Sequence, residues 1–296
     1  MLEAMGSDAA VAMRVLWFGN GLNILLDPCL IYGWGPFPEL GVTGAGVATV
    51  IGRGAGAACQ VWILARGNGR VRIRREHLRF CRKATADLAR VSLTGMAQFF
   101  IATAGWIGLM RITAMFGSNA LAGYTIAIRI ITFSILPAWG LSGAASTLVG
   151  QNLGAEKPDR AEKSVWLTAA YNTAFLGVIG VAFLIFGHHF MGFFTADPEV
   201  IRVGADCLRF ISYGYLFYAL GMVLVNAFNG AGDTWTPTVL NFFCFWLWEL
   251  PLAWVLALPL DLGPRGVFLA ITVAESTLAV ASLIAFRRGR WKKKKI

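Results

Sequence analysis

Long apolar runs separated by short polar turns dominate this chain. A helix needs about 20 mostly apolar residues to cross a bilayer, and eight runs meet that length. The expected spans lie at about 11–31, 42–65, 88–115, 120–149, 164–190, 200–228, 236–260 and 265–286. Residues 178–186 are apolar on every side, whereas the strands of a membrane β-barrel alternate apolar and polar residues. The pattern predicts an all-α membrane protein with eight transmembrane helices.

Composition supports a membrane protein and argues against an enzyme. The 296 residues are 57% hydrophobic and only 14% charged, whereas a soluble domain is about 25% charged. The five cysteines are scattered and form no CxxC pair, so neither a disulfide framework nor a metal site is expected. Clustered histidines or carboxylates and a nucleophile motif are also missing from the sequence. We therefore expect no catalytic residues and no cofactor.

The distribution of positive charge predicts how the chain crosses the membrane. Lys and Arg gather at 66–90, 156–163 and 287–295, and are scarce at 27–41, 116–119, 188–199 and 259–265. Cytoplasmic segments carry the excess of Lys and Arg, so we expect both termini in the cytoplasm and the protein in the inner (plasma) membrane. Because the net charge of +10 sits at helix ends, we expect no nucleic-acid partner. The C-terminal lysines are expected to be solvated, with contact to anionic lipid as the alternative.

The end of the chain repeats its beginning. Gly6-Ser7-Asp8 corresponds to Ala231-Gly232-Asp233, Pro28 corresponds to Pro251, and Leu40-Gly41-x-x-Gly44 corresponds to Leu262-Gly263-x-x-Gly266. An even number of predicted spans separates the two aspartate turns, so the two copies run in the same direction. Several transporter folds contain such parallel repeats. The complete repeat is predicted to be the six helices from about 88 to 286, and the front copy contains only the last two helices.

This repeat divides the chain into four predicted parts. They are the end of an N-terminal lobe at 1–65, a basic cytoplasmic linker at 66–86, a six-helix C-terminal lobe at 87–290 and a basic cytoplasmic tail at 291–296. Four helices of the first lobe have no counterpart before Met1. We therefore expect a partial copy of a transporter, with a start assigned too late as the simplest account and a partner that supplies the missing helices as the alternative.

A motif in the complete copy resembles a known family. Residues 140–162 contain Gly150-Gln-Asn-Leu-Gly-Ala155 followed by Pro158-Asp-Arg160-Ala, which resembles the "GQNLGA…P.RA" stretch in the C-terminal lobe of the multidrug and toxic compound extrusion (MATE) family. Residues 23–28 and 40–45 are similar to the end of that family's N-terminal lobe, and residues 229–234 to the turn after its tenth helix. The resemblance implies that the chain corresponds to helices five to twelve of twelve.

The resemblance also implies a function. Such a protein is a secondary active antiporter that exports organic cations or drugs in exchange for H⁺ or Na⁺, so the expected substrate is a small lipophilic organic cation. Two alternatives remain open. A related flippase for lipid-linked or anionic substrates is weakly favoured by Arg53 and Arg129, which could line a basic cavity. A non-transporting fragment is the other alternative.

Four ionisable side chains fall inside the predicted spans, and such residues mark functional sites in membrane proteins. They are Glu249, Glu275, Arg129 and Arg53. Glu249 is the first candidate for cation coupling, because Pro251 frees backbone carbonyls beside it. Its alternative is a structural ion pair with Arg53 or Arg129. Glu275 is the second candidate, and a polar seam between helices is its alternative. Arg129 is expected to act as a structural partner.

Uncharged side chains complete the predicted site. Gln98 and Asn226 could line a cavity, or could form hydrogen bonds between helices. Tyr218 could hold a lipophilic cation through cation–π contact, or could simply pack. In sodium-coupled MATE proteins, a glutamate follows the Phe-Phe pair of the seventh helix and an aspartate stands on the tenth. Here Ile101 and Tyr218 occupy those places, so the resemblance does not support that cation site. The aspartate of proton-coupled members lies on a helix that precedes this chain.

Overall fold

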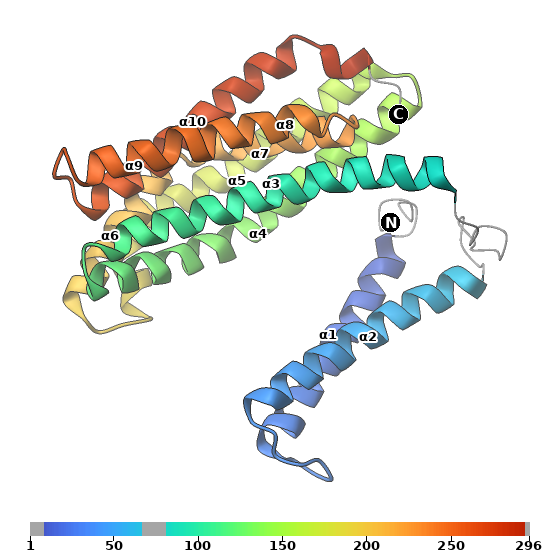
Figure 1. Cartoon of the computed structure of the whole chain (residues 1–296), viewed down its shortest axis with the longest axis horizontal. Helices are drawn as coiled ribbons and strands as arrows, with labels where there is room; N and C mark the ends of the chain where they lie inside the picture. Colours follow the sequence, from blue (N-terminus) through green and yellow to red (C-terminus); the bar gives the residue numbers. More distant parts are fainter. Residues whose placement is uncertain (1–8, 67–80, 294–296) are drawn as a thin grey trace. The chain divides into compact units, whose positions relative to one another are not determined.

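Helices form all the regular structure in the described part of the chain. The computed structural model describes residues 9–66 and 81–293. The chain forms two compact units, Met1–Arg82 and Lys83–Ile296, and each is considered by itself. In the N-terminal unit, α1 (Ala9–Tyr32) and α2 (Val42–Arg66) pack against each other as a helical hairpin (Figure 1). The predicted turn at 6–8 and most of the predicted linker lie outside the described residues.

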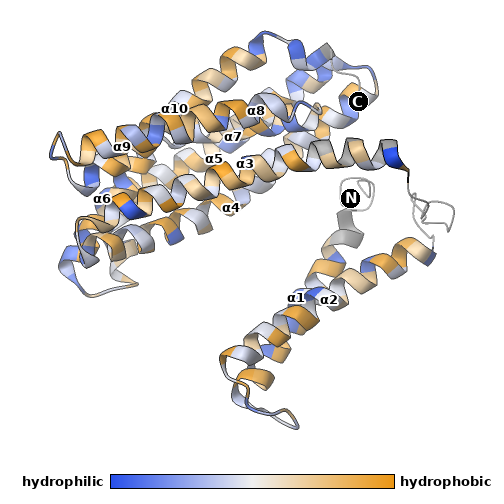
Figure 2. Ribbon diagram, viewed as in Figure 1, coloured by the Kyte–Doolittle hydropathy of each residue, from blue (hydrophilic) through white to orange (hydrophobic). Residues whose placement is uncertain are grey.

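The C-terminal unit is a bundle of helices (Figure 1). Its elements are α3 (Arg82–Ala114), α4 (Ser118–Gly154), α5 (Pro158–Gly192), α6 (Pro198–Tyr213), α7 (Tyr215–Gly230), α8 (Trp235–Asn241), the π-helix η3 (Phe242–Glu249), α9 (Leu250–Ala257), α10 (Pro264–Arg287) and the 3-10 turn η4 (Arg290–Lys293). Helices α4, α5, α6, α7 and α10 pack on one another and form the core. Hydrophobic residues make up most of the helical segments, and hydrophilic residues lie mainly at the turns (Figure 2).

The number of predicted spans is confirmed, with one change in shape. Within the described residues, seven helices are long and apolar enough to cross a membrane, and α6 with α7 makes an eighth if the bent pair counts as one span. The continuous helix predicted at 200–228 is wrong, because the chain bends by 60° between α6 and α7. Gly214 stands at the bend, where a Cβ would lie 3.1 Å from Thr272 Cγ2. The Thr272 hydroxyl also donates to the Phe210 carbonyl at 2.8 Å, which satisfies a backbone group beside the break.

The first copy of the Leu-Gly-x-x-Gly repeat closes the α1–α2 hairpin. The amide of Leu40 donates to the Leu30 carbonyl at 2.9 Å. Gly41 has φ of 55°, in the left-handed region that favours glycine. A Cβ at Gly44 would fall on the Leu30 carbonyl, so only glycine lets the start of α2 approach the end of α1 this closely.

The second copy closes the α9–α10 hairpin with the same contacts. The amide of Leu262 donates to the Leu256 carbonyl at 3.2 Å, and Gly263 has φ of 58°. A Cβ at Gly266 would lie 2.6 Å from the Leu256 carbonyl carbon. The repeated motif is therefore a joint between two helices, and each of its glycines has the same geometric role in both copies.

The C-terminal segment folds back onto the bundle. Trp291 is 1% exposed and stacks on Phe286 with 4.7 Å between ring centroids. Its indole nitrogen donates to the Phe286 carbonyl at 3.1 Å. The sequence predicts solvation for the C-terminal lysines, and Trp291 directly precedes them. Trp291 itself lies in a second hydrophobic core with residues of α4, α5 and α7, including Val149, Val165 and Phe228.

Candidate ion and substrate site

Glu249 lies where the helical hydrogen-bond pattern changes. It is the last residue of η3, and α9 follows with Pro251 as its second residue. Because proline has no amide hydrogen, it cannot donate to the Leu247 carbonyl, its partner in a regular α-helix. Short π-helical segments occur frequently at functional sites. Within this irregular stretch the Glu249 side chain is only 4% exposed.

A second carboxylate lies within electrostatic range of Glu249. Glu275 is half-buried on α10, which packs on η3, and the two carboxyl groups interact electrostatically. Among the residues that the structure describes, neither forms a hydrogen bond or an ion pair. The ion pair with Arg129 that the sequence left open is not formed, because Arg129 is exposed on α4. Arg53 belongs to the N-terminal unit.

Three more ionisable groups interact electrostatically with these carboxylates. Tyr218 on α7 is near both, as is Cys244 on η3, and Tyr124 on α4 is near Glu249. The Trp139 side chain contacts the Tyr218 hydroxyl. Neither Cys244 nor Tyr124 stands out in the sequence as a site residue. Cys244 precedes Glu249 by five residues, the hydrogen-bond spacing of a π-helix, but that spacing carries information only once the π-helix is known.

The predicted amides lie elsewhere and join helices. Gln98 on α3 donates to the Thr234 carbonyl at 3.1 Å and to Asn229 Oδ1 at 3.3 Å. These bonds attach α3 to the last turn of α7 and to the turn that follows it. Asn226 donates to Ser142 Oγ at 3.2 Å, which connects α7 with α4. Gln98 and Asn226 therefore form hydrogen bonds between helices, which is the alternative that the sequence left open to lining a cavity. Glu249, Glu275 and Tyr218 are thus brought together, whereas Arg129, Gln98 and Asn226 lie apart from them.

The motif in residues 140–162 brings two backbones together. A Cβ at Gly230, the last residue of α7, would collide with the backbone of Ser146 on α4. A Cβ at Gly150 would lie 3.3 Å from the Gly230 carbonyl oxygen. Asn152 donates its side-chain amide to the Leu148 carbonyl at 2.7 Å in the last turn of α4. These residues therefore pack and cap helix ends, as their residue types suggest.

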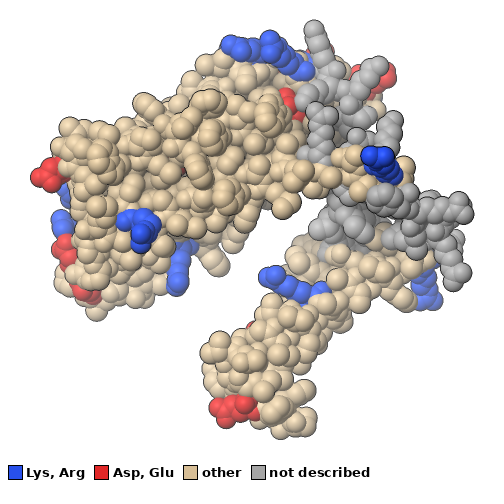
Figure 3. All heavy atoms as spheres, viewed as in Figure 1, with Lys and Arg blue, Asp and Glu red and all other residues tan. Residues whose placement is uncertain are grey.

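Charged side chains on the surface of the C-terminal unit gather toward its ends on the face shown in Figure 3. At one end, Arg265 pairs with Asp206 at 2.7 Å and Arg202 pairs with Glu199 at 2.6 Å. These four residues line a polar pocket of about 530 Å³. Across residues 9–66 and 81–293, no three His, Cys, Asp or Glu side chains are grouped as a metal site would need.

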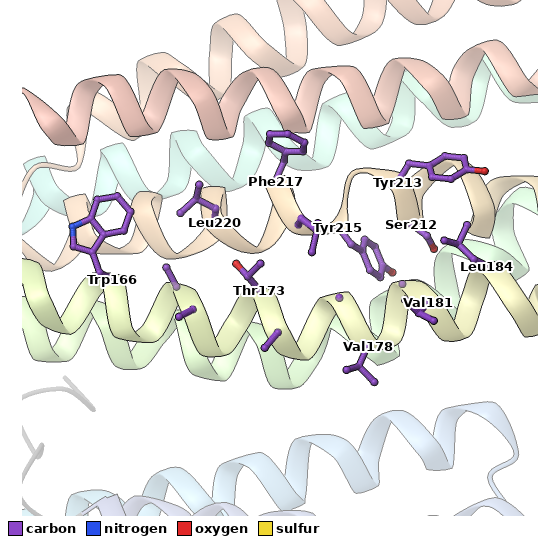
Figure 4. A pocket seen from close by; sticks show the side chains of 16 residues that line it. Trp166, Thr173, Val178, Val181, Leu184, Ser212, Tyr213, Tyr215, Phe217 and Leu220 are labelled. Atoms are coloured by element: carbon purple, nitrogen blue, oxygen red, sulfur yellow. The ribbon is translucent and has the colours of Figure 1, made fainter.

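A larger groove of about 1170 Å³ lies between α5 and the α6–α7 region (Figure 4). Its lining includes Trp166 at one end and Leu184 toward the other. None of the six predicted site residues lines this groove. The groove is therefore separate from the carboxylate site.

Comparison with known proteins gives consistent matches. The family model described as MatE matches residues 95–255. The chain is 27% identical over 296 residues to a probable multidrug resistance protein NorM of Thermotoga maritima, covering 100% of this chain and 63% of that protein. It is 25% identical over 292 residues to a probable multidrug resistance protein YoeA of Bacillus subtilis, covering 98% of this chain and 63% of that protein.

The fold also matches solved structures. A crystal structure of MATE in the bent conformation superposes with a TM-score of 0.87 at 23% identity, covering 97% of this chain and 63% of that chain. The chain thus spans about 63% of the length of these relatives. The matched proteins are membrane transporters that handle small molecules and are not enzymes.

Proposed function

Because this chain belongs to the MatE family of multi-pass membrane transporters, we propose that it serves in secondary antiport. In this proposal a lipophilic organic cation leaves the cell across the plasma membrane in exchange for H⁺ or Na⁺. The relatives named multidrug resistance proteins support the substrate class. The positive charge at 156–163 and 287–295 supports cytoplasmic ends for α5 and α10, and hence a cytoplasmic C-terminus.

Glu249 is the coupling residue in this proposal, and its burial without a counter-charge carries the argument. An ionised carboxylate in an apolar interior is unfavourable unless a cation or hydrogen-bond donors compensate it. Among the described residues, Glu249 is 4% exposed and has neither kind of partner. It is therefore neutral while it holds a proton, and becomes a cation site when the proton leaves. A proton and a cationic substrate then compete for one negative charge, which is the requirement for exchange.

We further propose that the coupling ion is H⁺. Hard metal cations need several oxygen ligands around them. The ionisable neighbours of Glu249 are Glu275, the phenols Tyr218 and Tyr124, and the thiol of Cys244. A thiol is a poor ligand for a hard cation, and Tyr218 stands where sodium-coupled members have an aspartate. One proton requires only one carboxylate.

Transport by the purified chain in lipid vesicles tests the proposal. Vesicles are given either a proton gradient or a sodium gradient of equal size, and movement of the fluorescent cation ethidium is followed. We expect the proton gradient to drive ethidium movement, Glu249→Gln to abolish the gradient-driven part and Glu249→Asp to retain some of it. Asp261→Asn is the matched control, because Asp261 is exposed in the loop before α10.

Each alternative gives a different result. Ethidium movement that responds to neither gradient overturns antiport by this chain. Movement driven by sodium alone overturns the proton assignment and retains antiport. Full proton-driven movement in Glu249→Gln, with Asp261→Asn also active, removes Glu249 from the coupling role.

A further inference from the structure

The groove between α5 and α7 has walls of membrane-spanning helix and a hydrocarbon lining. Along α5 the lining includes Trp166, Ala170 and Ala174, and along α7 it includes Tyr215, Leu216 and Leu220. Figure 4 shows Trp166 at one end of the groove, with Thr173 and Val178 following along α5. Both α5 and the bent pair α6–α7 are apolar enough to lie in the bilayer. Whatever fills the groove is therefore hydrocarbon of the membrane or another spanning segment.

The floor of the groove favours a flexible chain over a helix. Small residues on α5 can allow a neighbouring helix to approach, but only where the backbone is bare. Here Leu216 Cδ2 lies 3.3 Å from the position of a Cβ at Gly177, and Tyr215 Cδ2 lies 3.5 Å from that at Gly180. Side chains of α7 thus already cover the two glycines. The remaining space is lined mainly by apolar side chains, which suits an acyl chain.

Two positively charged side chains without an ion-pair partner among the described residues lie on α5 beyond the Trp166 end of the groove. Lys163 precedes Trp166 by three residues and Ala170 by seven, so it lies on the groove-lining face of α5. Lys163 and Arg160 are exposed, and neither pairs with a carboxylate in the described residues. Lys292 differs, because Glu162 and Asp159 neutralise it. At 1.5 Å per residue, Lys163 to Leu184 spans about 30 Å, comparable with the hydrocarbon core of a bilayer.

We propose that this groove is a binding site for one anionic phospholipid, with an acyl chain along the small residues of α5 and the phosphate beside Lys163 and Arg160. Charge complementarity at the Lys163 end determines the choice of an anionic lipid, and the apolar lining determines the place of its tail. The proposal stands independently of antiport, because the groove shares no residue with the Glu249 site.

Native mass spectrometry of the detergent-purified chain tests this proposal. The protein is equilibrated with equal amounts of phosphatidylglycerol and phosphatidylcholine, and retained lipid is counted for each variant. We expect one retained phosphatidylglycerol on the wild type. Lys163→Gln is expected to lower phosphatidylglycerol retention about fivefold and leave phosphatidylcholine unchanged. Ala174→Leu, which narrows the floor, is expected to lower retention of both lipids.

Matched controls separate the groove from general effects. Lys157→Gln removes an exposed lysine in the turn before α5, and Ala122→Leu enlarges an exposed alanine on α4. Both are expected to retain lipid as the wild type does. Equal retention of the two lipids by the wild type, or groove variants that match their controls, overturns the proposal. One further result overturns the proposal: the chain is a dimer, and Ala174→Leu makes it monomeric while lipid retention stays the same. The groove is then occupied by a second copy of the chain.

Discussion

Lys292 on η4 forms an ion pair with Glu162 on α5, with 2.5 Å between Nζ and Oε2. The same ammonium group lies 3.3 Å from Asp159 Oδ1. Beside it, Trp291 stacks on Phe286. The polar contacts and the buried indole together hold the end of the described chain against the start of α5.

This contact predicts a loss of stability in alkali. The hydrogen bond with Glu162 raises the pKa of Lys292 above its ordinary value. The stabilisation is therefore fully present below the unfolded pKa of about 10.4 and is lost as pH rises through the higher folded value. We expect the Tm of the wild type to fall more steeply above about pH 10 than that of Glu162→Gln. The difference is about 1 kcal/mol or less, because both groups are partly exposed.

Thermal melts of the two proteins at a series of pH values measure this effect. Lys157→Gln serves as a control, because Lys157 is exposed and forms no ion pair among the described residues. Parallel pH profiles for the wild type and Glu162→Gln would contradict the role of the ion pair.

Gly230 is expected to tolerate no side chain. A Cβ there would collide with the Ser146 backbone, so Gly230→Ala must push α4 and α7 apart. We expect destabilisation of about 1–3 kcal/mol, the usual cost of overpacking. Gly143→Ala on the same stretch of α4 is the control, because a Cβ there meets nothing within 4 Å. Chemical denaturation of both variants measures the difference, and equal midpoints would show that the contact is not close in solution.

Gln98 is expected to hold α3 against the rest of the C-terminal unit. Gln98→Leu removes its bonds to Thr234 and Asn229, so we expect faster amide hydrogen exchange in α3 and in residues 231–234. The expected loss is about 1 kcal/mol, since interhelical hydrogen bonds in membranes are worth that much. Gln151→Leu, at an exposed position near the end of α4, should leave exchange in α3 unchanged. Equal rates of amide hydrogen exchange in α3 for Gln98→Leu and Gln151→Leu would contradict this role of Gln98.

Tyr215 has a buried hydroxyl without a hydrogen-bond partner among the described residues. Its side chain is 1% exposed and packs against Phe183. Removing an unpaired buried polar group relieves its desolvation cost, so Tyr215→Phe is expected to raise the Tm slightly. Tyr213→Phe is the control, because the Tyr213 hydroxyl accepts a hydrogen bond from Arg209. A lower Tm for Tyr215→Phe would show that the hydroxyl forms a bond in solution.

The sequence predicts the helices and their joints well, because their causes are local. A run of apolar residues specifies each span, and the left-handed backbone at Gly41 and Gly263 is a property that glycine alone accepts readily. The bend at Gly214 could not be predicted in this way. It depends on Thr272, which is far along the chain and reaches the break only after α10 has packed.

The candidate site shows the same division between local and distant causes. An ionisable residue in an apolar run stands out in the sequence, and so Glu249 and Glu275 are found. The two carboxylates interact with each other and with Tyr218 and Cys244. These interactions depend on the packing of α7, η3 and α10. The π-helix has no local signal beyond Pro251, which predicts lost hydrogen bonds but not their pattern.

The duplicated joints also fix which positions of the two hairpins are equivalent. Counted from Gly44 along α2 and from Gly266 along α10, the ninth residues are Arg53 and Glu275. The two copies therefore share the turn, but carry opposite charges at the ninth position after it. Of the two copies, only the C-terminal hairpin carries an anionic group there. The symmetry between the two hairpins is thus one of shape, and they do not carry equivalent carboxylates at this position.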